Sequence, residues 1–173
     1  MQVEICRLKE ILPIHYHVLD NLLQLYAHET NEYHKYSISM GIDGRYRVKT
    51  SETLLREGRG YFMIVSGKYA GFILLSNQTK AQDGVFIAEF YILPYYRQGF
   101  LFKDILAELF KSFSGMVEYR ILCVNKRALL LFEFLAKRYF SSYIKANECE
   151  NELNYIRFTV NTSNLVLSYY LNP

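Results

Sequence analysis

The sequence lacks the residue patterns of several common classes of protein. Its three cysteines form no CxxC pair and no Cys/His spacing typical of a metal site, so we expect reduced thiols and no bound metal. It has no Walker-type GxxxxGK[ST] motif and no Ser/His/Asp order. No run approaches the roughly 18 apolar residues of a membrane-spanning helix, and no signal peptide is visible. We therefore expect a cytoplasmic protein without a membrane partner.

The sequence also lacks a strong excess of charge. A net charge of +3 is too small to indicate nucleic-acid binding, and no RNP-like or helix-turn-helix signal is present. Aromatic side chains are plentiful instead, with 16 tyrosines and 12 phenylalanines but no tryptophan, and they suit a core or a partner surface. Length and an apolar content of 51% predict a single domain over residues 1–173 with a substantial core, and no nucleic-acid partner is expected.

Hydrophobic periodicity predicts a mixed α/β domain. Helical spacing predicts four helices, over residues 15–33, 51–58, 102–113 and 126–138. The last is apolar nearly all round and should be largely buried. Short apolar runs predict strands over residues 2–8, 85–93, 119–124, 139–145 and 153–161, and a hairpin over 61–76 that turns at Ser66-Gly67-Lys68. The tail 162–173 is left open, as an edge strand or a loose end.

Residues 92–97, Ile-Leu-Pro-Tyr-Tyr-Arg, follow the predicted fourth strand and carry half of a known pattern. They resemble the motif V-x-P-x-x-R-x-x-G-x-G of the GNAT superfamily of N-acetyltransferases. A second family pattern, Asn-x-x-Ala-x-x-x-Tyr, is matched by Asn125, Ala128 and Phe132. The resemblance covers most of the chain. It implies a mixed, mostly antiparallel central sheet, flanked by about four helices and splayed between strands 4 and 5.

The glycine half of the first motif is altered. An alignment without gaps from Pro94 to Phe110 puts Phe100 and Phe102 where the family has its two glycines. Matching Gly99 instead needs one deletion and one insertion, so we favour the alignment without gaps. If the backbone needs a positive φ, each phenylalanine costs about 1–3 kcal/mol, and the two together would weaken ligand binding roughly 30- to 10,000-fold. If φ is helical, the two rings can turn aside.

The resemblance implies acetyl-CoA as co-substrate and an amine, on a small molecule or a protein, as acceptor, with no metal. In the family, backbone amides at the start of the third helix bind the diphosphate, which the helix dipole also favours. The resemblance places the cofactor contacts at Ile92, Leu93, Arg97, Gln98, Gly99, Phe100, Leu101, Phe102 and Asn125. Two of these have alternatives: Arg97 as an exposed loop residue, and Asn125 as the N-cap of the helix that follows it.

The catalytic base is the least constrained assignment. Glu89 lies on the predicted fourth strand, where it either faces the cleft as the amine's base or points into solvent. Phe132 occupies the position of the family's tyrosine acid and has no hydroxyl. Four tyrosines could substitute for it in space, although packing is the favoured role for each: Tyr91, Tyr95, Tyr96 and Tyr139.

Two functions follow from these residues. The first is an acyl-CoA-dependent N-acyltransferase, most simply an N-acetyltransferase. The second is a catalytically inactive protein with the GNAT fold that binds a partner or another ligand, which the altered loop and Phe132 favour. A homodimer formed through the C-terminal strands is left open.

Overall fold

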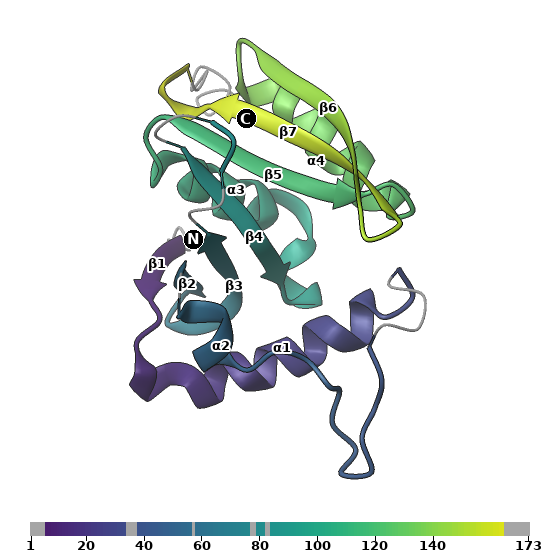
Figure 1. The fold of residues 1–173 in the computed structure, drawn as a ribbon. Helices are drawn as coiled ribbons and strands as arrows, with labels where there is room; N and C mark the ends of the chain where they lie inside the picture. Colours follow the sequence, from purple (N-terminus) through teal and green to yellow (C-terminus); the bar gives the residue numbers. More distant parts are fainter. Residues whose placement is uncertain (1–5, 34–37, 57, 77–78, 82–83, 165–173) are drawn as a thin grey trace. The chain divides into compact units, whose positions relative to one another are not determined.

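The computed structural model describes residues 6–33, 38–56, 58–76, 79–81 and 84–164 (Figure 1). They group into two compact units, one from Met1–Ser76 and Glu89–Ile105, the other from Asn77–Ala88 and Leu106–Pro173. Strand β4 (Val85–Ile92) and helix α3 (Gly99–Lys111) contribute residues to both units. The single domain over residues 1–173 stays a prediction. No helix within the described ranges has the length and apolar character needed to cross a membrane.

The strands hydrogen-bond in the order β1-β2-β3-β4-β5-β7-β6. The pairs of β1 with β2, β2 with β3, β5 with β7 and β6 with β7 are antiparallel, whereas β4 and β5 (Met116–Leu122) are parallel. The β4–β5 pairing runs only from Val85 opposite Val117 to Ile87 opposite Tyr119. This pairing involves only the part of β4 that belongs to the second unit. This mixed, mostly antiparallel sheet with four α-helices confirms the predicted fold.

The first unit is built on a three-stranded antiparallel arrangement. Strand β1 (Cys6–Glu10) pairs with β2 (Gly58–Val65), which pairs with β3 (Lys68–Ser76). Ser66 and Gly67 connect β2 and β3 with φ angles of 49° and 77°. Two successive positive φ values match the right-handed twist of a tight hairpin. The predicted hairpin is therefore confirmed.

Two apolar clusters cover opposite faces of these strands. Helix α1 (Tyr16–Thr30) packs Leu19, Leu22 and Leu23 against Phe62 and Phe72 on one face. On the other face lies a second cluster, formed by Cys6, Met63, Val65, Ala70, Ile92, Tyr96 and Ile105. The short helix α2 (Ser51–Leu55) begins at Thr50, whose hydroxyl accepts a bond from the Thr53 amide. The predicted helices at 15–33 and 51–58 are thus present, each shorter than expected.

The second unit packs helix α4 (Lys126–Tyr139) against strand β5, whose partner is β7 (Leu153–Asn161), with β6 (Tyr143–Glu150) beyond it. The prediction that the helix at 126–138 is largely buried is wrong. Leu135 and Ala136 are buried, but Leu130 and Phe134 are 73% and 52% exposed. Only one side of α4 packs against the strands, so an apolar sequence did not produce a helix buried all round.

Two predicted strand boundaries also need correction. The strand predicted at 139–145 begins only at Tyr143, because α4 continues through Tyr139 and the Phe140 amide still donates to the Ala136 carbonyl at 3.2 Å. The strand predicted at 119–124 begins earlier, at Met116. Of the tail, a 3-10 turn spans Thr162–Asn164, and residues 165–173 lie outside the described part of the chain.

Candidate functional site

The end of β4 that belongs to the first unit presents different chemistry on its two faces. Side chains alternate along a strand, so Glu89 and Tyr91 share one face and Phe90 and Ile92 share the other. Tyr91 packs in the cluster beneath α1, and Ile92 packs in the second cluster. The polar face of β4 is therefore the one turned towards α1, and the predicted site residue Glu89 lies on it.

Glu89 is half-buried and is held by a tyrosine from α1. The Tyr26 hydroxyl donates to Glu89 Oε2 at 2.5 Å, and the Tyr26 ring lies 5.6 Å from the Tyr91 ring and 5.9 Å from the Phe72 ring. The carboxylate of Glu89 thus faces α1 rather than bulk solvent.

Arg97 forms the centre of a second polar group in the same unit. Its Nε donates to the Ile92 carbonyl at 2.5 Å, and its NH2 lies 2.7 Å from Glu29 Oε2. Its guanidinium carbon is 5.2 Å from the centre of the Tyr91 ring. The predicted phosphate ligand is therefore neither a free loop arginine nor fully buried, since a third of its side chain is exposed.

Glu29 also binds the tyrosine of this group. The Tyr91 hydroxyl donates to Glu29 Oε1 at 2.7 Å, so the two oxygens of one carboxylate serve Tyr91 and Arg97 separately. Burial raises the pKa of the Tyr91 hydroxyl, and the hydrogen bond to the Glu29 carboxylate raises it further. Tyr91 consequently remains a protonated donor at neutral pH and is a poor source of a catalytic proton.

The two backbone amides at the end of β4 differ in their hydrogen bonding to β3. The Leu93 amide donates to the Ala70 carbonyl of β3 at 2.8 Å, which occupies one of the two backbone positions predicted to meet the cofactor. Successive residues of a strand direct their N–H groups to opposite edges, so the Ile92 amide points away from β3. Gly71 allows the two strands to approach, because a Cβ there would lie 2.0 Å from the Tyr91 carbonyl oxygen.

Helix α3 begins at Gly99, directly after the 3-10 turn Pro94–Arg97 and the exposed Gln98. Phe100 and Phe102 lie inside this helix. An α-helical backbone has a negative φ, so no positive φ strains either of them. The Phe102 ring packs against the cluster that contains Ile92, Tyr96 and Ile105. Of the two alternatives left open by the sequence, the helical one is correct for the backbone. The side chains of Phe100 and Leu101 lie outside what the structure describes.

The sequence matches no family model and no curated protein, but the architecture matches solved structures. A GNAT-family acetyltransferase structure from Chromobacterium violaceum superposes with a TM-score of 0.63 at 15% identity, covering 94% of this chain and 86% of that one. A chimera of the Vibrio cholerae spermidine N-acetyltransferase SpeG with hSSAT gives 0.58 at 13% identity, covering 91% and 96%. The chain has the GNAT fold. A GNAT-family structure from Desulfovibrio desulfuricans, at 0.54 and 10% identity over 92% and 99%, agrees.

In the GNAT fold of this chain, two of the predicted positions belong to the second unit. Asn125 is the N-cap of α4, where its Oδ1 accepts from the Ala128 amide at 3.0 Å, as the capping alternative predicts. Phe132 lies 5.1 Å from the Tyr119 ring, centre to centre. Burial raises the pKa of the Tyr119 hydroxyl, which has no hydrogen-bond partner among the described residues. A buried hydroxyl in this state is not an available acid.

The other three tyrosines considered as acids differ in how far they are buried. Tyr96 is buried in the second cluster of the first unit, and Tyr95 is exposed with its ring edge-on to Tyr96 at 5.0 Å. Tyr139 is buried in α4. The burial of Tyr96 and Tyr139 agrees with the packing role favoured from sequence, whereas Tyr95 is largely exposed.

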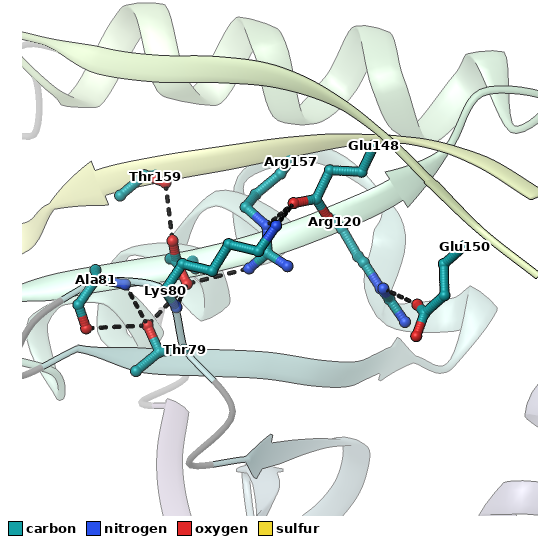
Figure 2. A network of polar contacts seen from close by, with 9 residues as sticks. Thr79, Lys80, Ala81, Arg120, Glu148, Glu150, Arg157 and Thr159 are labelled. Atoms are coloured by element: carbon teal, nitrogen blue, oxygen red, sulfur yellow. Dashed lines mark hydrogen bonds and ion pairs between the residues drawn. The ribbon is translucent and has the colours of Figure 1, made fainter.

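A separate charged cluster lies in the second unit, on strands β5, β7 and β6 (Figure 2). Glu118 is buried and accepts from Thr79 at 2.7 Å, the Lys80 amide at 2.7 Å, Arg157 at 3.1 Å and Thr159 at 3.3 Å. Burial opposes its ionisation, yet these donors lower the pKa of Glu118 below its ordinary value. These four donors to Glu118 all belong to the second unit, which is typical of a structural network.

Glu148 completes this network at its outer end. Its Oε1 accepts from Arg157 Nε at 2.7 Å and pairs with Lys80, and these contacts lower the pKa of Glu148 to about 2. Arg120 pairs with Glu150 beside it. Within the ranges that the structure covers, no group of three or more His, Cys, Asp and Glu side chains is arranged to hold a metal ion.

Sequence reasoning missed Glu29 and the role of Tyr26. Both lie on α1, three positions apart, so they occupy neighbouring positions on one side of the helix. Tyr26 was assigned only to the apolar stripe, and Glu29 carried no motif. The available signal was a glutamate three residues after the apolar stripe of the helix predicted over residues 15–33.

Proposed function

We propose that this protein is an N-acetyltransferase that transfers an acetyl group from acetyl-CoA to an amine. Acetyl-CoA supplies the activated thioester, and the residues of the chain bind it, orient the amine and accept a proton. The amine nitrogen bonds to the thioester carbon, the C–S bond breaks, and the departing thiolate takes its proton from solvent. A thiolate is a tolerable leaving group, which is why Phe132 in place of an acid is compatible with the reaction.

The observation that supports this proposal best is the conformation of the altered loop. The first four amides of an α-helix, counted from its N-cap, lack an acceptor within the helix, and at the start of α3 these belong to Gln98 through Leu101. Because the Phe102 ring packs into the core, it does not cover that end of the helix by itself. The amides and the positive end of the helix dipole then favour a diphosphate in the same way as a glycine loop.

The residues of the first unit divide the remaining roles. The Ile92 amide, which points away from β3, is the proposed donor to the thioester carbonyl, whereas the Leu93 amide is already bonded to Ala70. Glu89 is the proposed acceptor of the amine's proton, directly or through a water, since it is a half-buried carboxylate on the face of β4 turned towards α1. Gln98 and Asn125 remain proposed cofactor contacts, Asn125 through the amide nitrogen that its capping bond leaves unused.

An amine is the proposed acceptor class. Solved structures with this fold include spermidine N-acetyltransferases, and in this chain two carboxylates, Glu29 on α1 and Glu89 on β4, accompany one arginine where the helix packs on the strand. A positively charged amine suits such a surface more than an acidic acceptor does.

Calorimetry with acetyl-CoA is the first test. We expect binding in the micromolar range, and no heat at millimolar ligand would overturn the transferase proposal. Glu89→Gln should then lower turnover roughly 100-fold, the lower end of general-base effects, with little change in coenzyme affinity. Glu52→Gln, an exposed carboxylate on α2, is the matched control and should leave turnover unchanged.

The second function is that of a GNAT-fold protein that binds a partner and does not catalyse. The contact of Arg97 with Glu29 favours it, because this contact occupies the arginine without a ligand. Binding of acetyl-CoA without transfer to any amine of a broad panel, from polyamines to peptide N-termini, would select this function over the first.

A further inference from the structure

The guanidinium of Arg97 offers one edge to protein acceptors and is partly open to solvent. An arginine has five N–H donors in a planar fork. Nε donates to the Ile92 carbonyl and NH2 to Glu29, so the contacts lie along the Nε/NH2 edge. That edge is also one that binds a phosphate in a bidentate manner, because two parallel N–H groups match two oxygens of one anion.

The carboxylate of Glu29 occupies this edge, and the Glu29 side chain is itself only partly buried. The Arg97 and Glu29 side chains are each 33% exposed, so neither charge is sealed from solvent. Ion pairs with this exposure contribute little free energy, which corresponds to a preference of at most about fivefold. A multiply charged phosphate can therefore displace this carboxylate, which a buried pair would not permit.

The packing around the pair makes such an exchange local. Tyr91 continues to donate to Glu29 Oε1 whether or not Arg97 is present, so the carboxylate keeps one partner when the guanidinium leaves. Arg97 lies at the end of the 3-10 turn, two residues before α3, and no strand pairing depends on its side chain. Only the arginine rotamer has to change.

The following inference rests on the proposed function. We propose that Glu29 and a phosphate of the coenzyme are alternative partners of Arg97. By competing for the guanidinium, Glu29 lowers the affinity of the protein for acyl donors that carry a phosphate. In the free chain the carboxylate neutralises the arginine. When a phosphate binds, Arg97 transfers its Nε/NH2 edge from Glu29 and Ile92 to the ligand. The Glu29 charge also repels the phosphate across the short distance that separates them.

The first experiment compares Glu29→Gln with Glu32→Gln, which removes the same charge from an exposed position three residues further along. We expect Glu29→Gln to bind coenzyme A about two- to tenfold more tightly than the wild type, with the gain shrinking as salt is added. Glu32→Gln should bind as the wild type does. Pantetheine, which lacks the diphosphate, should bind all three proteins equally.

Weaker binding of coenzyme A by Glu29→Gln would overturn the inference, because it would mean that Glu29 orients Arg97 for the ligand. Unchanged binding would overturn it too. Arg97→Gln combined with Glu29→Gln should abolish the gain, since the gain requires the guanidinium. A gain that survives in the double variant would show a general charge effect and contradict the exchange.

A second measurement separates this inference from the proposed function. The Arg97 Nε–H resonance, followed by NMR during titration with inorganic pyrophosphate, should shift at a lower concentration in Glu29→Gln than in the wild type. If no variant binds acetyl-CoA but this difference is present, the transferase proposal fails and the competition at Arg97 stands. If pyrophosphate shifts the resonance equally in wild type and Glu29→Gln, the competition is overturned whatever acetyl-CoA does.

Discussion

Each of the two units contains an arginine that is paired with a carboxylate, and the two arrangements differ in how completely their charges are satisfied. In the second unit Arg157 joins Glu118 and Glu148, with its side chain 10% exposed and that of Glu118 3% exposed. In the first unit Arg97 meets Glu29 alone, and a third of each side chain is exposed. The same residue types therefore form a fixed scaffold in one place and an exchangeable contact in the other.

The difference teaches where to look for ligand binding in a chain with several charged clusters. Glu118 has four donors from two segments, residues 79–80 and strand β7, so an incoming ligand would have to break a satisfied, buried network. Around Arg97, by contrast, the neighbouring residues Tyr91 and Phe102 are held by apolar packing in the two clusters of the first unit, rather than by ion pairs. We expect substitutions in the two regions to differ accordingly.

Arg157→Ala should have the largest effect. It leaves Glu118 and Glu148 without their guanidinium, and breaking a buried pair in this way costs about 3–5 kcal/mol of unfolding free energy. Urea unfolding followed by circular dichroism measures it. The control is Arg127→Ala on the exposed side of α4, expected within about 0.5 kcal/mol of wild type. A loss below 1 kcal/mol for Arg157→Ala would remove the distinction between the two clusters.

Phe102→Ala tests whether apolar packing carries the first unit. The ring is partly buried against the second cluster, so we expect a loss of about 2 kcal/mol, half of the value for a fully buried phenylalanine. Coenzyme affinity should not rise, because the ring does not obstruct the start of α3. Tighter binding by this variant, measured by calorimetry, would revive the view that the ring is an obstacle.

Acid should weaken the second unit through Glu148. Its pKa is lowered from an ordinary 4.5 to about 2 in the folded chain, so its contribution is present above pH 4.5 and is lost as the pH falls to about 2. We expect roughly 1–2 kcal/mol to disappear over this window, allowing for its partial exposure. Glu148→Gln should flatten this part of the curve of unfolding free energy against pH. An unchanged slope would show that other carboxylates are responsible.

Arg97→Ala should have the smallest effect on stability, about 0.5–1 kcal/mol, because its ion pair is exposed. Arg157→Ala removes the same side chain. The difference between the two variants in lost unfolding free energy is therefore the most direct comparison of the two clusters. Equal losses, measured by urea unfolding under the same conditions, would mean that Arg97 is a structural residue and not an exchangeable one.

The fold was predictable where the pattern had a single interpretation. The hairpin at Ser66-Gly67 and the helix after Gly99 were confirmed because a turn that needs positive φ and a long 3.6-residue period leave few alternatives. The burial of α4 was not predictable, since hydrophobicity along one helix does not say how many neighbours will cover it. The start of β6 failed because Tyr139 and Phe140 suit a helix end and a strand equally.

The site was predictable only in its local parts. A motif along the chain located Arg97 and Asn125, and a strand pattern located Glu89. The role of Glu29 could not be predicted from the sequence. Its partners Tyr91 and Arg97 are more than 60 residues away along the chain and meet it only because α1 packs on β4. Whether the phenylalanines were strained likewise depended on where the helix begins.

The helical placement of Phe100 and Phe102 has a consequence for recognising similar chains. What an anion meets at the start of α3 is a set of peptide nitrogens, and these exist whatever the side chains are. A sequence search that requires the two glycines of the motif misses any homologue in which bulky residues at these positions pack against the core, as Phe102 does. Screening by the shape of the strand-to-helix junction would retain them.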